Sequence, residues 1–458
     1  MKRFVILCLG AVLLLSGCGK IFHSTSVPQK AKDEPVLIDS SDIVVFMRYY
    51  LTEYNTMMQS GTIEVVYGEH VAQKLMLLAE KHPDSRYADD ALFFAAKIYY
   101  ETGKNDEAAE LFRRVYTQYA DGMMSTESNR YGYTFHIAPL AHLYYAMTID
   151  FHQEKISQAA GEYTQILQKY AKFAEERYML DDISGNVAAE AQFNSGYAHE
   201  RLKNYMIAVQ EYMRTVLRYS GYFLAKHEGE RHDYAEMALE RIYIVATGDA
   251  KQPDQANIYL REMLNQLIFS DYFPKIRFYL GSIALEQKKY SEAIKNFRDI
   301  INSVRSSSFK EVDLILATLD KVKYIERLKV KEVVAESENL TEYLCKSILH
   351  GKDMTAESTD SIVSDLLAAE TLLYLSTLYF EQTKKDLAVK YSVQIFQRYP
   401  YLVSSNGDYM TIKTAALLKN NLPQNEYIDL LKGLITFIPE KYDAKFVLRK
   451  ELQSYANN

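Results

Sequence analysis

Apolar residues recur every three or four positions along most of the chain, and short polar breaks separate the apolar stretches. Residues 90–120 show this pattern most clearly, with apolar positions at Leu92, Ala95, Ala96, Tyr99, Ala108, Phe112 and Val115. This spacing places apolar side chains on one face of a helix. Gly103 lies between the two apolar runs and marks a turn. The pattern therefore predicts two antiparallel helices joined by a short turn.

The same spacing returns four more times along the chain. The small or apolar residue equivalent to Ala96 is expected at Met147, Gly196, Gly281 and Ser376, so that successive copies are separated by 51, 49, 85 and 95 residues. Two helices cross closely only where side chains are small. We therefore expect helix crossings at Ala96, Ala108, Gly196, Ala208, Gly281 and Ala293.

This pattern resembles the tetratricopeptide repeat, a unit of about 34 residues. The resemblance implies that neighbouring hairpins stack, because one hairpin cannot bury its own apolar face. We predict an all-α, tetratricopeptide-type helical-hairpin solenoid with irregular inserts. Residues 41–303 form the main array, with loops or long helices inserted at 121–139 and 172–187, and residues 304–458 hold further helical or degenerate hairpins. One array or two packed arrays both agree with this length.

The N-terminus has the pattern of a secretion signal. Lys2 and Arg3 precede an apolar run over residues 4–15, as in signal peptides. The run ends in Leu-Ser-Gly-Cys at residues 15–18, which resembles the bacterial lipobox. That resemblance implies removal of residues 1–17 and lipidation of Cys18, with residues 18–40 as a flexible tether. The alternative is a conventional signal peptide followed by an ordinary buried cysteine.

Charge and cysteine content narrow the possible functions. The net charge of −7 becomes −9 without Lys2 and Arg3, which argues against a nucleic-acid partner. Of the three cysteines, Cys8 lies in the predicted signal peptide and Cys18 is the expected lipid site. Cys345 then remains alone, so we expect a buried structural thiol and no intramolecular disulfide.

The sequence contains no phosphate-binding loop, nucleophile elbow or zinc-ligand spacing. The polar segment 227–233 holds two histidines, for which a solvated loop is favoured over a metal site. Wall-cleaving transglycosylases use a Glu-Ser pair on helical repeats, but Glu127-Ser128 and Glu336-Ser337 lack the expected flanking pattern. We therefore expect no catalytic residues, no metal and no cofactor.

The tetratricopeptide resemblance implies a concave surface lined by the first helix of each hairpin. Its expected partner-binding residues are Phe93, Lys97, Tyr100, Tyr144, Phe151, Phe193, Tyr197 and Arg201. Such an aromatic groove with scattered charges suits an extended peptide or a helix from a partner. The alternative is that the aromatic residues, such as Phe93, Tyr144 and Phe193, only pack between hairpins.

Residues 82–91, His-Pro-Asp-Ser-Arg-Tyr-Ala-Asp-Asp-Ala, resemble the repeat junction of the BamD family of outer-membrane lipoproteins. That resemblance covers the N-terminal half and implies a periplasmic scaffold or adaptor that binds envelope proteins, including a β-barrel assembly subunit. Gly19 after the cysteine favours the outer membrane. Related junctions occur in other repeat lipoproteins. A division- or peptidoglycan-linked adaptor and a secretion or pilus pilotin therefore remain alternatives.

Overall fold

The computed structural model describes residues 43–59, 65–128, 132–173, 176–180, 183–226, 230–248, 251–267, 271–303, 309–329, 339–355, 362–404 and 406–456. The predicted signal peptide, Cys18 and the tether lie outside these residues, as does Glu336-Ser337. The chain divides into two compact units, Met1–Tyr259 and Leu260–Asn458. The predicted division at residue 303 therefore lies inside the second unit.

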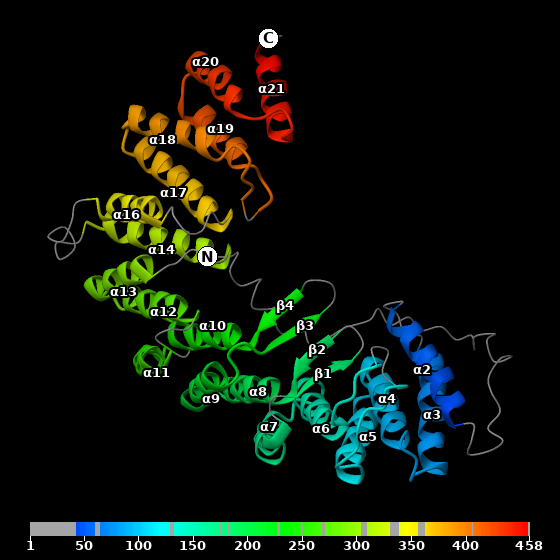
Figure 1. Cartoon of the computed structure of the whole chain (residues 1–458). Coiled ribbons are helices and arrows are strands. Elements are labelled where there is room, and N and C mark those ends of the chain that lie inside the picture. Colours follow the sequence, from blue (N-terminus) through cyan, green and yellow to red (C-terminus); the bar gives the residue numbers. More distant parts are fainter. Residues whose placement is uncertain are drawn as a thin grey trace. The chain divides into compact units, whose positions relative to one another are not determined.

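The first unit is a series of antiparallel helical hairpins (Figure 1). Its helices are α2 (Ile43–Gln59), α3 (Val65–Lys81), α4 (Ala88–Glu101), α5 (Asn105–Gln118), α6 (Ile137–Met147), α7 (Ile156–Lys169), α8 (Val187–Arg201), α9 (Tyr205–Arg218) and α10 (Tyr234–Thr247). A π-helical turn, Thr148–His152, extends α6, and a short 3-10 turn, Ala171–Phe173, follows α7. Helix α11 (Pro253–Gln266) contains the boundary between the two units.

The second unit is also built from helices (Figure 1). They are α12 (Phe273–Glu286), α13 (Tyr290–Ser303), α14 (Phe309–Arg327), α16 (Leu340–Thr355), α17 (Ile362–Glu381), α18 (Lys385–Arg398), α19 (Met410–Asn421), α20 (Gln424–Leu434), a 3-10 turn Ile435–Phe437 and α21 (Asp443–Ala456). In the described part of the chain, only α17 is long and apolar enough to cross a membrane, and 61% of its most apolar window is buried inside the protein. Such burial is typical of a core helix.

Small residues lie where the sequence predicts helix crossings. Ala96, Ala108, Ala208 and Ala293 have no exposed surface. A Cβ atom added to Gly196 would lie 2.7 Å from the Tyr212 ring, and one added to Gly281 would lie 2.6 Å from the Phe297 ring. In both hairpins the absence of a side chain on the first helix therefore makes room for an aromatic ring of the second.

The turn between the helices of a hairpin has a common geometry. Five of the hairpins share a left-handed residue in the turn, at Gly103 (φ 79°), Glu154 (φ 53°), Lys203 (φ 62°), Lys288 (φ 60°) and Thr383 (φ 60°). In four of them the next N–H donates to the carbonyl five residues earlier, as from Lys104 to Tyr99 at 2.8 Å. This bonding ends a helix in the manner of a Schellman motif.

The fifth turn contains one extra residue. There Lys155 N–H donates to the Ile149 carbonyl, six residues earlier, because the chain passes through the π-helical turn. Counting back from the turn with this extra residue places Ala146, rather than Met147, at the crossing. The expected register is therefore wrong by one residue in this hairpin. A π-helical turn is a common way to accommodate a single insertion.

The first unit also contains a small antiparallel sheet that the sequence pattern did not predict. Its strands are β1 (Arg177–Leu180), β2 (Ile183–Asn186), β3 (Phe223–Lys226) and β4 (Glu230–Asp233), paired in that order. The segment expected as a loop or long helix at 172–187 therefore forms a β-hairpin. Strand β2 pairs with β3 from the next inter-helix segment, with Ser184 opposite Ala225. Figure 1 shows the four strands beside α8 and α10.

Candidate partner-binding surface

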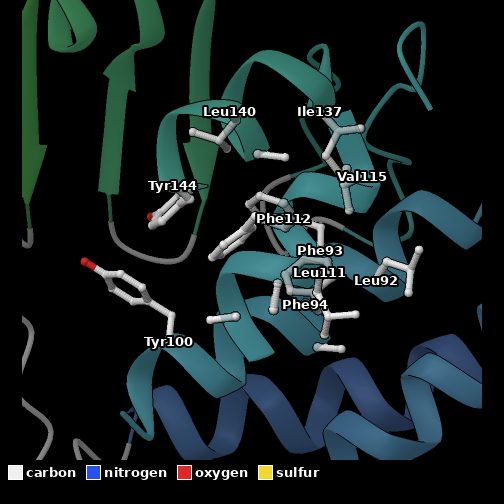
Figure 2. Close-up of a cluster of buried hydrophobic side chains, with 14 of the residues drawn as sticks. Leu92, Phe93, Phe94, Tyr100, Leu111, Phe112, Val115, Ile137, Leu140 and Tyr144 are labelled. Atoms are coloured by element: carbon white, nitrogen blue, oxygen red, sulfur yellow. The ribbon is translucent and has the colours of Figure 1, made fainter. Parts of the chain in front are cut away.

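Five of the eight expected partner-binding side chains are buried in the first unit. Phe93, Lys97, Tyr100, Tyr144 and Phe193 are each at most 8% exposed. Figure 2 shows Phe93, Phe112 and Tyr144 gathered in one apolar cluster. The Phe112 and Tyr144 rings are stacked with centroids 5.2 Å apart, and the Phe93 ring meets both edge-on. The expectation that these side chains are exposed is corrected, because aromatic rings of their own hairpin and of the neighbouring hairpin pack against them.

Lys97 is a charged member of this buried group. Its Nζ donates to Glu101 Oε1 at 3.0 Å and to the Tyr144 hydroxyl at 3.3 Å. It also lies 4.6 Å from the centroid of the Tyr144 ring. An ion pair and an aromatic face together offset part of the cost of burying an ammonium group. Lys97 therefore contributes to packing between hairpins in this structure.

Phe193 is buried for a similar reason. Its ring lies 5.6 Å from the Tyr212 ring of its own hairpin and 6.4 Å from the Tyr234 ring at the start of α10. The next hairpin again supplies the cover. Phe93, Tyr144 and Phe193 therefore follow the alternative in which the aromatic residues pack between hairpins.

The three remaining residues, Phe151, Tyr197 and Arg201, are half-buried and lie together. The Phe151 and Tyr197 ring centroids are 6.2 Å apart. The Arg201 guanidinium lies 5.6 Å from the Phe151 centroid and 5.9 Å from the Tyr197 centroid. These side chains come from the π-helical turn after α6 and from α8, the first helices of successive hairpins. With Arg241 of α10, they form what we name the aromatic–arginine cluster.

A fully buried carboxylate holds Arg201 in place. Arg201 Nη1 donates to Asp150 Oδ1 at 2.6 Å, and the Tyr163 hydroxyl donates to Asp150 Oδ2 at 3.1 Å. Burial raises the pKa of Asp150 to about 6, and the Arg201 charge opposes that rise. Because the Asp150 side chain has no exposed surface and that of Arg201 is 26% exposed, the pair reaches solvent only on the arginine side.

Arg241 has an equivalent support on the next hairpin. Its Nε donates to Glu200 Oε2 at 3.0 Å, and the Tyr212 hydroxyl donates to the same oxygen at 2.8 Å. The Arg241 guanidinium lies 5.4 Å from the Tyr197 centroid. Two supported guanidinium groups therefore flank one tyrosine ring. A guanidinium held in this way keeps other N–H donors for a partner's carboxylate or carbonyl oxygen.

Sequence reasoning missed Asp150 and Arg241. Asp150 lies next to Phe151, but its inward direction depends on the π-helical turn, which no sequence pattern indicated. Arg241 lies in a hairpin over residues 234–267, where the apolar pattern of the sequence is too degenerate to give a repeat register. An arginine on the first helix of that hairpin, following Arg201 on the preceding one, was the available signal.

The other candidate residues, which are metal ligands, Cys345 and Glu127, give no indication of a catalytic or metal site in the described part of the chain. The described residues hold no group of three or more potential metal-ligating side chains. Cys345 is a buried free thiol whose pKa is raised by burial, as expected for a structural cysteine. A backbone hydrogen bond, Thr126 and Arg86 lower the pKa of Glu127, whereas a general acid needs a raised one.

Comparison with known proteins agrees with the hairpin architecture. A family model described as "Tetratricopeptide repeat" matches residues 78–122. No curated protein matches the chain.

Similar solved structures have low identity to this chain. PilF of Pseudomonas aeruginosa is 12% identical, with 82% of this chain and 99% of that chain covered and a TM-score of 0.26. The apo form of RapI is 13% identical, with 82% and 99% covered and a TM-score of 0.29. A human IFIT1 dimer is 10% identical, with 93% and 97% covered and a TM-score of 0.25. These TM-scores are too low to support an argument about function. From its hairpins and the matched repeat, the chain has an all-α fold of the tetratricopeptide type.

Proposed function

We propose that this chain is a membrane-anchored scaffold lipoprotein that binds protein partners at the periplasmic face of the outer membrane, in outer-membrane protein assembly. A tetratricopeptide-type fold supports binding of protein partners in general. The anchor and the location are supported by the sequence alone, through residues 15–18 and the junction at 82–91.

The observation that carries the binding role is the aromatic–arginine cluster. It spans the first helices of successive hairpins, and Phe151, Tyr197, Arg201 and Arg241 are all partly exposed. Rings with flanking guanidinium groups can contact both the apolar side chains and the backbone carbonyls of a partner segment. The surface proposed from the sequence is thereby narrowed from eight residues to this cluster.

Affinity purification from solubilised membranes tests both the surface and the partner. Tyr197→Ser should reduce recovery of the partner while the variant stays folded, because Tyr197 is half-buried and central to the cluster. Arg113→Gln is a control outside the cluster, on α5, where the arginine is exposed and pairs with Glu110. Equal recovery with both variants would show that the cluster does not bind the partner.

The identity of the recovered partner separates the proposed assembly role from the alternatives. Recovery of a β-barrel assembly subunit supports outer-membrane protein assembly. Recovery of wall enzymes, or of pilus or secretion components, would instead support an adaptor or a pilotin. Labelling cells with a fatty-acid probe tests the anchor separately: Cys18→Ser should abolish incorporation, and an unchanged label would refute lipidation at this residue.

A further inference from the structure

A shallow groove lies on the first unit between the loop before α4 and the segment that follows α5. It is lined by residues 83–86, by residues 118–119 and 121–127, and by Asp89 and Thr134. The residues of the aromatic–arginine cluster are not among them, so the groove is a separate surface. The groove lies at the repeat junction over residues 82–91, and the sequence pattern did not indicate a groove there.

The groove carries an excess of negative charge. Among the described lining residues, Asp84, Asp89, Asp121 and Glu127 are acidic and Arg86 alone is basic. Arg86 Nη2 is already paired with Glu127 Oε1 at 2.7 Å. The remaining three carboxylates therefore make the electrostatic potential in the groove negative, which favours a cationic ligand.

Of the carboxylates that line the groove, Asp89 gives the strongest indication of a ligand. It lies in the first turn of α4 and is only 4% exposed, yet it lines the groove. Its side chain accepts the Asp90 N–H, at 3.0 Å from Oδ1, and its own backbone N–H, so that its hydrogen bonds in the described structure come from the backbone of the first turn. No basic side chain in the described residues pairs with Asp89. Burial raises the pKa of its carboxyl to about 6, as expected for an uncompensated carboxylate.

The second oxygen of Asp89 lies against a glycine. A Cβ atom added to Gly122 would come within 2.2 Å of Asp89 Oδ2. Gly122 therefore leaves the room that this oxygen occupies. Helix polarity accounts for part of the stability of a carboxylate in a first turn, but it does not explain why the carboxylate lines an acidic groove.

The neighbouring Asp90 differs because it has a structural partner. Asp90 Oδ2 accepts the Ser125 N–H at 3.2 Å, which ties the segment after α5 to α4. Asp90 is completely buried and does not line the groove. Asp89 has no such tie to the segment after α5, and its carboxylate lines the groove, where it can meet a ligand.

We propose that this groove binds an arginine side chain of a partner polypeptide, with the guanidinium on Asp89 and the rim carboxylates Asp84 and Asp121 beside it. A guanidinium has five N–H donors in a plane and can bridge more than one carboxylate. Tyr119, Pro83 and Met123 line the same groove and offer apolar contact for the arginine stem. A metal ion fits less well, because the described residues hold no group of three or more ligating side chains.

The test measures binding of a short fluorescein-labelled peptide with one arginine among glycines and serines, by fluorescence anisotropy on the full chain. A second peptide carries citrulline, which has nearly the shape of arginine without its charge. The arginine peptide should bind about tenfold or more tightly than the citrulline peptide. Asp89→Asn should remove that difference, and Asp121→Asn, at the exposed rim, should reduce it by about twofold to threefold.

Asp386→Asn is the matched control. Asp386 is the second residue of α18 as Asp89 is the second residue of α4, but it is exposed and lies in the second unit. It therefore has the same charge and the same place in a helix but does not line this groove, and its substitution should leave peptide binding unchanged. Circular dichroism checks that each variant is folded.

Three outcomes would overturn the proposal. They are equal binding of the two peptides, equal binding by Asp89→Asn and Asp386→Asn, and binding of Ca²⁺ that requires Asp89 in a protein that binds neither peptide.

Discussion

Gly196 and Gly281 lie where the second helix of a hairpin presses an aromatic ring against the first. Gly196→Ala would place a methyl group 2.7 Å from the Tyr212 ring, and the ring has no room to retreat because Tyr212 is completely buried. We expect a loss of about 1–3 kcal/mol in the free energy of unfolding, measured by urea denaturation.

The control for this substitution is Gly161→Ala in α7. No heavy atom lies within 4 Å of a Cβ atom added there. Alanine in a helix is favoured over glycine by roughly 0.5–1 kcal/mol, so this variant should be more stable. The same sign for both variants would mean that the crossing contact is misplaced.

A second residue-scale prediction concerns the buried carboxyl of Asp90. Burial, followed by the nearby Asp89 charge, raises its pKa from 3.8 to about 7. The folded protein therefore holds this proton more tightly than the unfolded chain does, and stability from this group is complete below about pH 4 and is lost as the pH rises through 7.

Asp90→Asn removes the charge and keeps an acceptor for the Ser125 N–H. Relative to the wild type, the variant should gain roughly 1–3 kcal/mol in the free energy of unfolding between pH 4.5 and pH 8, since one unit of pKa shift is worth about 1.4 kcal/mol. Urea unfolding at the two pH values measures this gain. A difference that does not change with pH would refute a raised pKa.

Contacts within one hairpin can be predicted from the sequence more readily than contacts between hairpins, and the reason is distance along the chain. Gly196 and Tyr212 are 16 residues apart, within one hairpin, so one repeat pattern contains the whole contact. The burial of Phe93 instead depends on Tyr144 from the next hairpin. The repeat pattern assigns Phe93 to the first helix but does not show how closely the next hairpin covers it.

At the scale of elements, several described hairpin turns hold a non-glycine residue in the left-handed region, among them Lys203 and Lys288. This backbone costs about 1–2 kcal/mol for an L-residue, partly offset by the greater freedom that glycine has when unfolded. Lys203→Gly and Lys288→Gly should therefore each raise the free energy of unfolding by up to about 1 kcal/mol. Gly103 already occupies the equivalent place in the first clear hairpin.

Lys295→Gly in α13 is the control for the turn variants. Lys295 is also an exposed lysine but lies inside a helix, where glycine costs about 1 kcal/mol. Thermal unfolding should show opposite shifts for Lys288→Gly and Lys295→Gly. A loss of stability in both would mean that the turn is not left-handed in solution.

Neither the strands nor the π-helical turn could be predicted from the sequence, and the physical reasons differ. Each strand has four residues, too few to show a period of two, and the β2–β3 pairing joins segments about 40 residues apart. The π-helical turn adds one residue without disturbing the apolar pattern. Its effect is visible only in the inward direction of Asp150, which in turn positions Arg201.

At the scale of the whole molecule, Ala108 belongs to an apolar core of the first unit and Ala293 to an apolar core of the second. In a repeat protein, each hairpin depends mainly on its neighbours. Ala108→Leu should overpack its crossing and cost about 1–3 kcal/mol. Amide hydrogen exchange should then be faster in α4 to α6 and unchanged in α17 and α18.

Ala293→Leu provides the reciprocal measurement. Amide hydrogen exchange should become faster in α12 to α14 and stay unchanged in α4 to α6. Faster exchange throughout the chain in either variant would contradict independent units. Lipidation of Cys18 stays a prediction, because it depends on a short N-terminal motif and not on the fold of the described residues.

The small sheet has a mechanical consequence. A stack of hairpins joined only through side-chain packing can bend and stretch like a spring, since each interface can give slightly. Strands β1 to β4 connect the segments before α8 and before α10 by backbone hydrogen bonds that resist such sliding. We therefore expect the sheet to limit movement of α8 against α10, the helices that carry the two arginines of the aromatic–arginine cluster.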